Sequence, residues 1–131
     1  APLPTRSPRP PANRGAIADK VTPAAGEPVI VKNYPNSFVG TDLEAQLKAS
    51  GRTQLVIAGF MTHMCVNSTT RGAFNLGFSP TVVAAATATR DLPDPAGQTI
   101  PAATLQQTSL ATLADLFAII APDTASLLAA G

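Results

Sequence analysis

A run of four apolar residues, Leu55-Val56-Ile57-Ala58, is the feature of the sequence that most constrains the fold. A strand with one face in water alternates apolar and polar residues, whereas this run is apolar at every position. Such a strand is typical of a parallel sheet that helices cover on both faces. Parallel neighbours also need crossover connections, and these are usually helices. The run therefore predicts an α/β domain in which helices and strands alternate.

Three more strands are predicted from short apolar or β-branched runs, at 29–31, 81–86 and 117–120. Helical patterns with short connections separate these runs, so right-handed crossovers around a parallel sheet are expected. The chain has 131 residues, of which 45% are hydrophobic, which is enough for the core of one domain of this kind.

Three helices are predicted between the strands from capping residues and the spacing of apolar side chains. Thr41 and Glu44 have the spacing of a capping box, which satisfies free backbone N–H groups in a first helical turn. Glycine after a helical pattern marks its end, because glycine adopts the left-handed conformation readily. The predicted helices begin at Thr41, Cys65 and about Pro101; Gly51 and Gly77 end the first two, and Leu105, Leu113 and Leu116 share a face of the third.

The first twenty residues differ in composition from the rest. Five of the 13 prolines lie within the first eleven residues, where fixed φ angles and missing N–H donors oppose both helices and strand ladders. Four basic residues against Asp19 give residues 1–20 a charge of +3, whereas the other 111 residues sum to −2. Residues 1–20 are therefore predicted to be a disordered Pro/Arg-rich leader, and 21–131 the folded domain.

Composition also excludes several functional classes. A formal charge of +1 with 13% charged residues argues against electrostatic binding of nucleic acid. No apolar run approaches the ~18 residues of a membrane-spanning helix, so no membrane partner is expected. One His and one Cys are too few for a Cys/His zinc site or a disulfide scaffold. With one Cys and no export signal, a reducing cytoplasm is the expected location.

Two side chains with catalytic chemistry follow predicted strands, at the sheet edge where open α/β sheets bind ligands. Lys32 ends the strand at 29–31, and Cys65 lies after the strand at 55–58, in the first turn of a helix. Free backbone N–H groups and the helix dipole favour a thiolate there, and a nearby ammonium favours it further. The alternative is a small buried hydrophobe at Cys65 and a surface charge at Lys32.

A specific resemblance lies in the loop after the strand at 55–58. The loop reads Gly59-Phe60-Met61-Thr62-His63-Met64-Cys65-Val66, with Thr70-Arg71 and Gly77-Phe78 behind it. It resembles the nucleophile loop of the isochorismatase-like cysteine hydrolases, a family that includes nicotinamidases and carbamoyl-amide hydrolases. Residues 26–32 and 37–43 likewise resemble the family's lysine strand and the loop and helix behind it. Over about residues 15–128, the resemblance implies a three-layer α/β/α fold with a parallel sheet and Rossmann-like topology.

The resemblance also implies roles for individual residues. Cys65 would be the nucleophile and Lys32 the catalytic lysine, with a cis peptide bond between Phe60 and Met61. The backbone N–H groups of Met61 and Cys65 would form an oxyanion hole. The thiolate would attack the carbonyl of a small amide, expel an amine as a thioester forms, and then yield to water. True isochorismatases lack the Cys, so Cys65 favours cleavage of a C–N bond.

The third catalytic group of the family is an Asp on the first strand, upstream of the lysine strand. Between Ala1 and Lys32 the only Asp is Asp19, whose surroundings match the stretch just ahead of that lysine strand. The general acid or base is therefore unassigned, with Asp91 after the strand at 81–86 as an alternative. The chain is thus expected to be N-terminally incomplete and to correspond to the C-terminal two-thirds of such a hydrolase.

Weaker signals surround the expected site. Thr62 is predicted to cap the helix of Cys65, and His63 either lines the pocket or faces solvent. The resemblance implies no metal, because the Asp and His cluster of some nicotinamidases has no counterpart here. No other cofactor is expected, and a homodimer or larger homo-oligomer is the family expectation. Candidate substrate contacts are Phe38, Phe60 and His63, with Tyr34 and residues 87–90 beside them; core packing is the alternative for the aromatic rings.

These observations leave three functional hypotheses. The first is a hydrolase of small amides with Cys65 as nucleophile. The second is a non-catalytic module or truncated pseudoenzyme of the same family, kept for binding or oligomer formation. The third is a redox-sensing thiol, for which the sequence offers no second Cys to resolve an oxidised sulfur.

Overall fold

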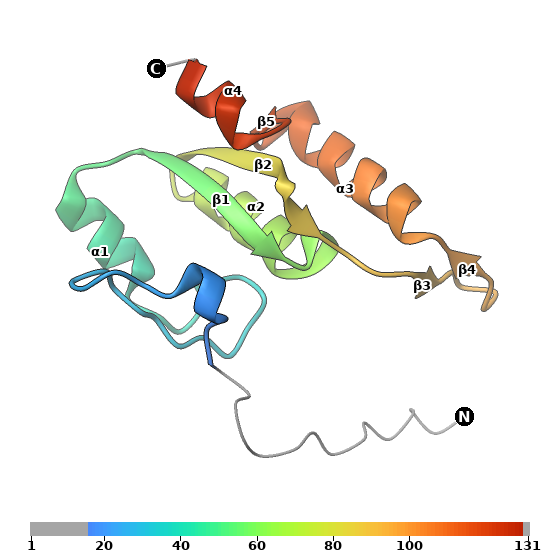
Figure 1. The fold of residues 1–131 in the computed structure, drawn as a ribbon, viewed down its shortest axis with the longest axis horizontal. Helices are drawn as coiled ribbons and strands as arrows, with labels where there is room; N and C mark the ends of the chain where they lie inside the picture. The colour runs from blue at the N-terminus through green and yellow to red at the C-terminus, as the bar shows by residue number, and fades with distance from the viewer. Residues whose placement is uncertain (1–15, 130–131) are drawn as a thin grey trace.

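The computed structural model describes residues 16–129 (Figure 1). Most of the expected leader, residues 1–15, lies outside this range, and the described part of it ends in a short 3-10 turn. In chain order the elements are η1 (Asp19–Val21), α1 (Leu43–Ser50), β1 (Gln54–Phe60), the π-helical turn η2 (Thr62–Val66), α2 (Asn67–Asn75), β2 (Ser79–Ala88), β3 (Leu92–Pro93), β4 (Thr99–Ile100), α3 (Ala102–Leu116), β5 (Ile119–Ala121) and α4 (Thr124–Ala129).

Strands β1, β2 and β5 form a parallel sheet with β2 in the middle. The ladder places Val56 beside Thr81 and Thr81 beside Ile119, so these three residues form one row across the sheet. The chain crosses from β1 to β2 through η2 and α2, and from β2 to β5 through α3. The predicted α/β class and parallel sheet are therefore confirmed. The short antiparallel pair β3 and β4 lies outside this sheet and was not predicted.

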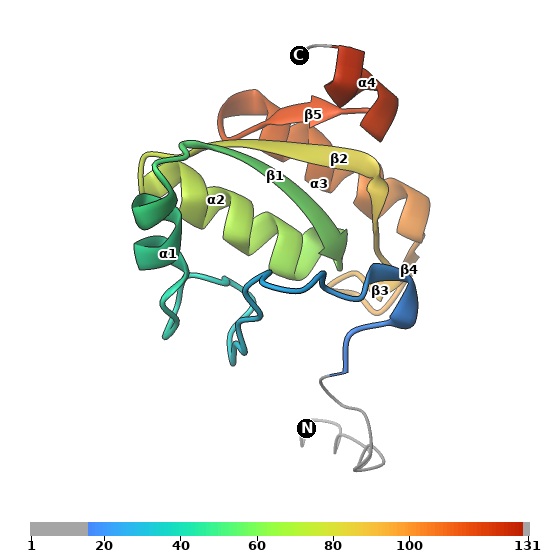
Figure 2. The ribbon, with the colours of Figure 1, turned by 60° about the vertical axis from the view of Figure 1, so that its left-hand side comes forward.

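Helices α2 and α3 lie on the same face of the sheet (Figure 2). The centre of the core is formed there by Val66, Val82 and Leu113, one each from η2, β2 and α3. Burying aliphatic side chains of this size stabilises the fold by about 1.5–3 kcal/mol each. Because Val66 directly follows Cys65, the core and the candidate nucleophile share one turn of backbone.

Side chains along β1 are alternately exposed and half-buried, although the sequence predicts a strand covered by helices on both faces of the sheet. Val56 is 62% exposed and Ile119, in the same row, is 71% exposed. The alternation arises because, among residues 16–129, α2 and α3 pack on one and the same face. In the described part of the chain, the row of Val56, Thr81 and Ile119 therefore lies on the less covered face.

The strand predicted at 29–31 is wrong, because these residues have no ladder partner among the described residues. Val29 is 61% exposed and Val31 is 84% exposed, so neither is the buried strand residue that its side chain suggests. Beta-branched residues favour an extended backbone, but a strand also needs a neighbour to which its N–H and C=O groups bond. Among the described residues, β1 pairs only with β2. Lys32 is therefore carried by a loop.

The first predicted helix is confirmed, but its capping box is not. Gly51 ends α1 at φ 72°, in the left-handed conformation that the sequence predicts. The Thr41 hydroxyl donates to the Ser37 carbonyl at 2.6 Å and accepts the Leu43 N–H at 3.4 Å, rather than the Glu44 N–H that a capping box uses. The Glu44 carboxylate accepts from Lys48 on the next turn at 2.5 Å, so it does not reach back to the helix start.

The later helices follow the prediction closely and differ at their ends. Gly77, at φ 90°, follows α2, and the Phe78 N–H closes the turn on the Ala73 carbonyl at 3.0 Å. On α3, Leu113 is fully buried whereas Leu116 in the last turn is 63% exposed. Phe117 ends α3, so the last strand begins at Ile119, two residues after its predicted start.

The small helix α4 was not predicted. It begins after Asp123, whose carboxylate accepts hydrogen bonds from the Ser126 N–H at 2.8 Å and the Ser126 hydroxyl at 2.9 Å. These bonds stabilise the ionised carboxylate and lower the pKa of Asp123 from its ordinary value.

Candidate active site

Cys65 lies in the π-helical turn η2, which follows the carboxyl end of β1 and continues directly into α2. The predicted position of the thiol at a helix start is therefore confirmed. Thr62 and Val66 hold the turn on either side, with 0% and 3% of their surface exposed, while Cys65 itself is half-buried. The peptide bond between Phe60 and Met61 is cis, as the resemblance implies. The thiol thus projects from a turn whose neighbours are fixed in the core.

Lys32 reaches this thiol from a segment 33 residues earlier in the chain. Its Nζ lies 3.1 Å from the Cys65 Sγ, within hydrogen-bond distance. The same Nζ donates to the carbonyl oxygens of Tyr34 at 2.9 Å and Pro35 at 3.3 Å. An ammonium has three N–H donors, so these three acceptors use all of them. The Lys32 side chain is therefore fixed beside the sulfur by two carbonyl oxygens.

The loop that follows Lys32 packs on α2 and is bonded to it through Thr69, whose hydroxyl also donates to the Pro35 carbonyl at 3.3 Å. The Thr69 Oγ1 accepts the Ser37 backbone N–H at 3.0 Å and lies 3.0 Å from the Ser37 hydroxyl. One turn further along α2, the Asn36 side chain lies directly over Gly72. A Cβ at position 72 would come within 2.7 Å of the Asn36 Nδ2, closer than real Cβ atoms approach. The Thr69 bonds hold the Lys32 loop against α2, and the absence of a side chain at Gly72 leaves room for Asn36.

A cavity of about 290 Å³ opens beside the sulfur. Lys32 and Cys65 lie together on its wall, and the carboxyl half of β1 provides much of the rest. A volume of this size suits a small molecule. The lining residues are Lys32, Ser37, Val56, Ile57, Ala58, Gly59, Phe60, Cys65, Val66 and Thr69.

The three candidate substrate contacts lie in different places. Phe60 lines the cavity and is 73% exposed. Phe38 is not among the lining residues, because its ring stacks on Phe78, with 6.0 Å between ring centroids and 14° between planes. His63 is also absent from the lining, and its Nδ1 is bonded to the Thr89 hydroxyl at 2.5 Å. Of the three, only Phe60 is therefore placed beside Cys65 and Lys32.

Thr62 is not the cap that its position suggests. Its side chain is fully buried, and its hydroxyl donates to the Gln106 Oε1 on α3 at 2.5 Å. The Gln106 Nε2 in turn donates to the Thr87 hydroxyl near the end of β2 at 2.8 Å. Sequence reasoning missed Gln106, whose only local signal is a polar residue next to Leu105 on the packed side of a helix.

The alternative proton-transfer residue, Asp91, has another partner. Its carboxylate accepts the backbone N–H of Ala102 at 2.8 Å, so it serves the first turn of α3.

Within residues 16–129, no three His, Cys, Asp or Glu side chains gather closely enough to hold a metal ion. No helix in that range is sufficiently long and apolar to cross a membrane.

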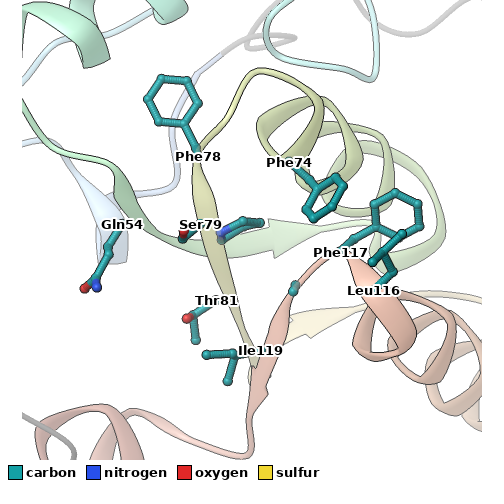
Figure 3. Close-up of a pocket in the computed structure, with 10 residues that line it drawn as sticks. Gln54, Phe74, Phe78, Ser79, Thr81, Leu116, Phe117 and Ile119 are labelled. Atoms are coloured by element: carbon teal, nitrogen blue, oxygen red, sulfur yellow. The ribbon is translucent and has the colours of Figure 1, made fainter.

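A larger hollow of about 400 Å³ lies at the other end of the sheet (Figure 3). Gln54 and Ser79, the first residues of β1 and β2, lie on its wall, and Phe74 and Phe117 face one another across the helical side. Because Cys65 follows the opposite ends of these strands, this hollow is separate from the candidate active site.

Comparison with known proteins agrees with this arrangement. Residues 3–123 match the isochorismatase domain. An uncharacterised isochorismatase family protein of Bacillus subtilis, YrdC, is 43% identical over 111 residues, which are 84% of this chain and 59% of that protein. A secreted isochorismatase effector of Verticillium dahliae is 38% identical over 101 residues, covering 77% of this chain and 50% of the effector. This chain thus spans between half and three-fifths of the length of these relatives.

The fold is shared with solved structures of the same family. An isochorismatase from Pseudomonas putida superposes with a TM-score of 0.79 at 42% identity, covering 82% of this chain and 55% of that one. Two further relatives are named for reactions on amides. A ureidoacrylate amidohydrolase of Methylobacterium radiotolerans is 39% identical over 72 residues, covering 55% of this chain and 28% of that protein. The structure of an N-carbamoylsarcosine amidase of Thermoplasma acidophilum matches with a TM-score of 0.65 at 25% identity. The match covers 80% of this chain and 53% of the amidase. By its sequence and its fold, the chain belongs to the isochorismatase family of hydrolases.

Proposed function

We propose that the chain provides the thiol and the lysine of a hydrolase that cleaves the C–N bond of a small amide. The observation that carries the proposal is the 3.1 Å contact between the Lys32 Nζ and the Cys65 Sγ on the wall of one cavity. The two relatives named for amide hydrolysis support this class of substrate. A positive charge fixed beside a half-buried sulfur is the environment that activates a nucleophilic cysteine.

The reaction would proceed through a thioester. The Cys65 thiolate attacks the carbonyl carbon, and the backbone N–H groups of Met61 and Cys65 stabilise the oxyanion that forms. As the C–N bond breaks, the leaving amine takes a proton from the Lys32 ammonium. Water then adds to the thioester and gives one proton to the neutral Lys32 amine. The thiolate leaves, so the acid is released and both residues return to their starting forms.

The first test measures the thiolate without needing the substrate. We expect Cys65 in the folded full chain to react with iodoacetamide at neutral pH about tenfold or more faster than free cysteine does. Lys32→Met removes the positive charge and is expected to abolish most of this advantage. Lys48→Met is the matched control, because Lys48 pairs with Glu44 on the exposed side of α1. A thiol no faster than free cysteine, and indifferent to Lys32→Met, would contradict the proposal and favour a non-catalytic module.

The second test looks for the covalent intermediate. N-carbamoyl amino acids are suitable first probes, given the names of the two relatives. After mixing and acid quench, intact-mass analysis is expected to show an acyl adduct that Cys65→Ala lacks. Lys32→Met should lower the turnover of an accepted amide about 10²-fold or more, because it removes a proton-transfer group.

Two further expectations accompany the proposal. A homodimer or larger assembly stays a prediction, which size-exclusion chromatography with light scattering would check. A cytoplasmic location also stays a prediction, and one relative, that of Verticillium dahliae, is named as secreted.

A further inference from the structure

Three side chains from three different elements form one chain of hydrogen bonds behind the candidate nucleophile. The Thr62 hydroxyl in η2 donates to the Gln106 Oε1 on α3 at 2.5 Å, and the Gln106 Nε2 donates to the Thr87 hydroxyl on β2 at 2.8 Å. The Thr87 hydroxyl then donates to the Ala84 carbonyl at 2.9 Å. The turn that carries Cys65 is thereby connected, through a single amide, to the end of the central strand.

The donor and acceptor of every hydrogen bond in this series are fixed by the Ala84 carbonyl at its end. The Ala84 carbonyl has no hydrogen, so the Thr87 hydroxyl has to donate to it and is left to accept from the other side. The group at position 106 must therefore donate to Thr87 and accept from Thr62. A glutamine amide does both with its two terminal atoms, whereas a glutamate carboxylate only accepts.

We propose that Gln106 is a positioning residue, which sets the place of the Cys65 sulfur relative to Lys32 by holding Thr62. The inference rests on the proposed function, since it concerns the same thiol. Thr62 lies three residues before Cys65 in the same turn and is fully buried, so its hydroxyl has no water to replace Gln106. Lys32 is fixed independently, by the carbonyl oxygens of Tyr34 and Pro35. A shift of the Thr62 turn therefore changes the distance between Sγ and Nζ.

The test compares Gln106→Glu with Gln107→Glu. Both add one negative charge to α3 by the same change of side chain, but residue 107 is exposed and makes no hydrogen bond to η2. Alkylation of Cys65 by iodoacetamide is measured at about pH 6.5, where the rate depends on the thiolate fraction, and at about pH 10, where mainly access to the sulfur decides it. The ratio of the two rates reports the Lys32 contact and is insensitive to the general stability of a folded sample.

We expect Gln106→Glu to lower this ratio about tenfold, because a sulfur displaced from the Lys32 ammonium loses the fixed charge that favours thiolate over thiol. Gln107→Glu should leave it unchanged within about twofold. If Gln106→Glu does not fold, Thr87→Val removes the far partner from the end of β2 and carries the same expectation. A ratio equal to wild type in a folded Gln106→Glu or Thr87→Val variant would overturn the inference.

The outcome for the wild-type chain separates this inference from the proposed function. If wild-type Cys65 shows a ratio no higher than that of free cysteine, the proposed function itself fails, whatever Gln106 does. If the wild-type ratio is high and survives the loss of the Gln106 bonds, the proposed function stands and Gln106 serves packing alone.

Discussion

The two halves of the candidate site are held in different ways. The turn of Cys65 lies between Thr62 and Val66, which are 0% and 3% exposed and which pack against β2 and α3. The segment of Lys32 has Val31 beside it at 84% exposure, with no strand ladder among the described residues. The turn of the candidate nucleophile is thus fixed to the core, whereas the lysine is carried on an exposed segment and attached by a few polar contacts.

This difference shows how stability and chemistry can be separated within one site. Contacts around the Cys65 turn bury apolar area and contribute to the free energy of unfolding of the whole domain. Contacts of the Lys32 segment bury little, so losing them changes the distance between two reactive atoms more than it changes the fold. Variants around the Cys65 turn should therefore lower the free energy of unfolding, whereas variants in the Lys32 segment should mainly change the reactivity of Cys65.

The largest expected effect is on the core side. Leu113→Ala removes a fully buried side chain that packs with Val66, and should lower the free energy of unfolding by about 2–5 kcal/mol. Urea denaturation followed by circular dichroism measures this change. A loss under about 1 kcal/mol would contradict the view that the Cys65 turn is fastened to this core.

Gly72→Ala is the sharpest way to disturb the lysine side alone. The new Cβ would meet the Asn36 amide at 2.7 Å, so the Asn36 side chain has to give way, and with it the bond that its Oδ1 accepts from the Phe38 N–H in the loop beyond Lys32. We expect the neutral-pH alkylation rate of Cys65 to fall about tenfold, with little change in stability, because alanine favours the helix.

Two companion variants make the Gly72→Ala result interpretable. Asn75→Ala alters an exposed residue in the last turn of the same helix and should leave the rate unchanged. Asn36→Ala combined with Gly72→Ala removes the colliding amide and should restore most of the rate. If the double variant stays as slow as Gly72→Ala alone, the substitution at residue 72 does not act on Cys65 through the Asn36 side chain.

Thr69→Val tests the hydrogen bonds that attach the lysine loop to α2. It removes the acceptor of the Ser37 N–H together with the bonds to the Ser37 hydroxyl and the Pro35 carbonyl, and should cost about 1–2 kcal/mol, because these partly exposed groups can bond to water instead. The alkylation rate should fall by less than in Gly72→Ala, because the two Lys32 carbonyl partners remain. An effect on stability as large as that of Leu113→Ala would break the proposed distinction between core and loop.

The smallest effect is expected at Val31. Since this side chain is 84% exposed, Val31→Thr should change the free energy of unfolding by no more than about 0.5 kcal/mol. A larger loss in thermal or urea denaturation would indicate that residues 29–31 pack against a surface in solution after all.

The sequence predicts the elements around the Cys65 turn better than it predicts the Lys32 segment. The run at 55–58, the helix of Cys65 and the glycines that end α1 and α2 are encoded by neighbouring residues, and each is confirmed. The predicted strand at 29–31 is wrong, because a ladder depends on a partner elsewhere in the chain. The proximity of Lys32 and Cys65 was expected only through the family resemblance, since no local pattern joins residues 33 apart.

Long-range polar contacts were the hardest to foresee. Gln106 lies 44 residues from Thr62, and although its spacing from Leu113 places it on the packed side of α3, no local pattern indicates that Thr62 is its partner. Phe38 had two expected places, and its stacking on Phe78 favours core packing over the pocket wall. Both outcomes depend on how α3 and the Lys32 loop dock, which is decided by the whole core rather than by local sequence.

The three acceptors around Lys32 have a consequence for how a substrate would be received. An ammonium whose hydrogens are all shared has none to spare, so an incoming carbonyl oxygen can bind it only by replacing an existing acceptor. The Pro35 carbonyl, the longest of the three contacts at 3.3 Å, is the one that costs least to replace. Substrate entry then exchanges one hydrogen bond for another of similar strength. Affinity would have to come from the rest of the ligand, which leaves this lysine free to act on the reaction rather than on binding.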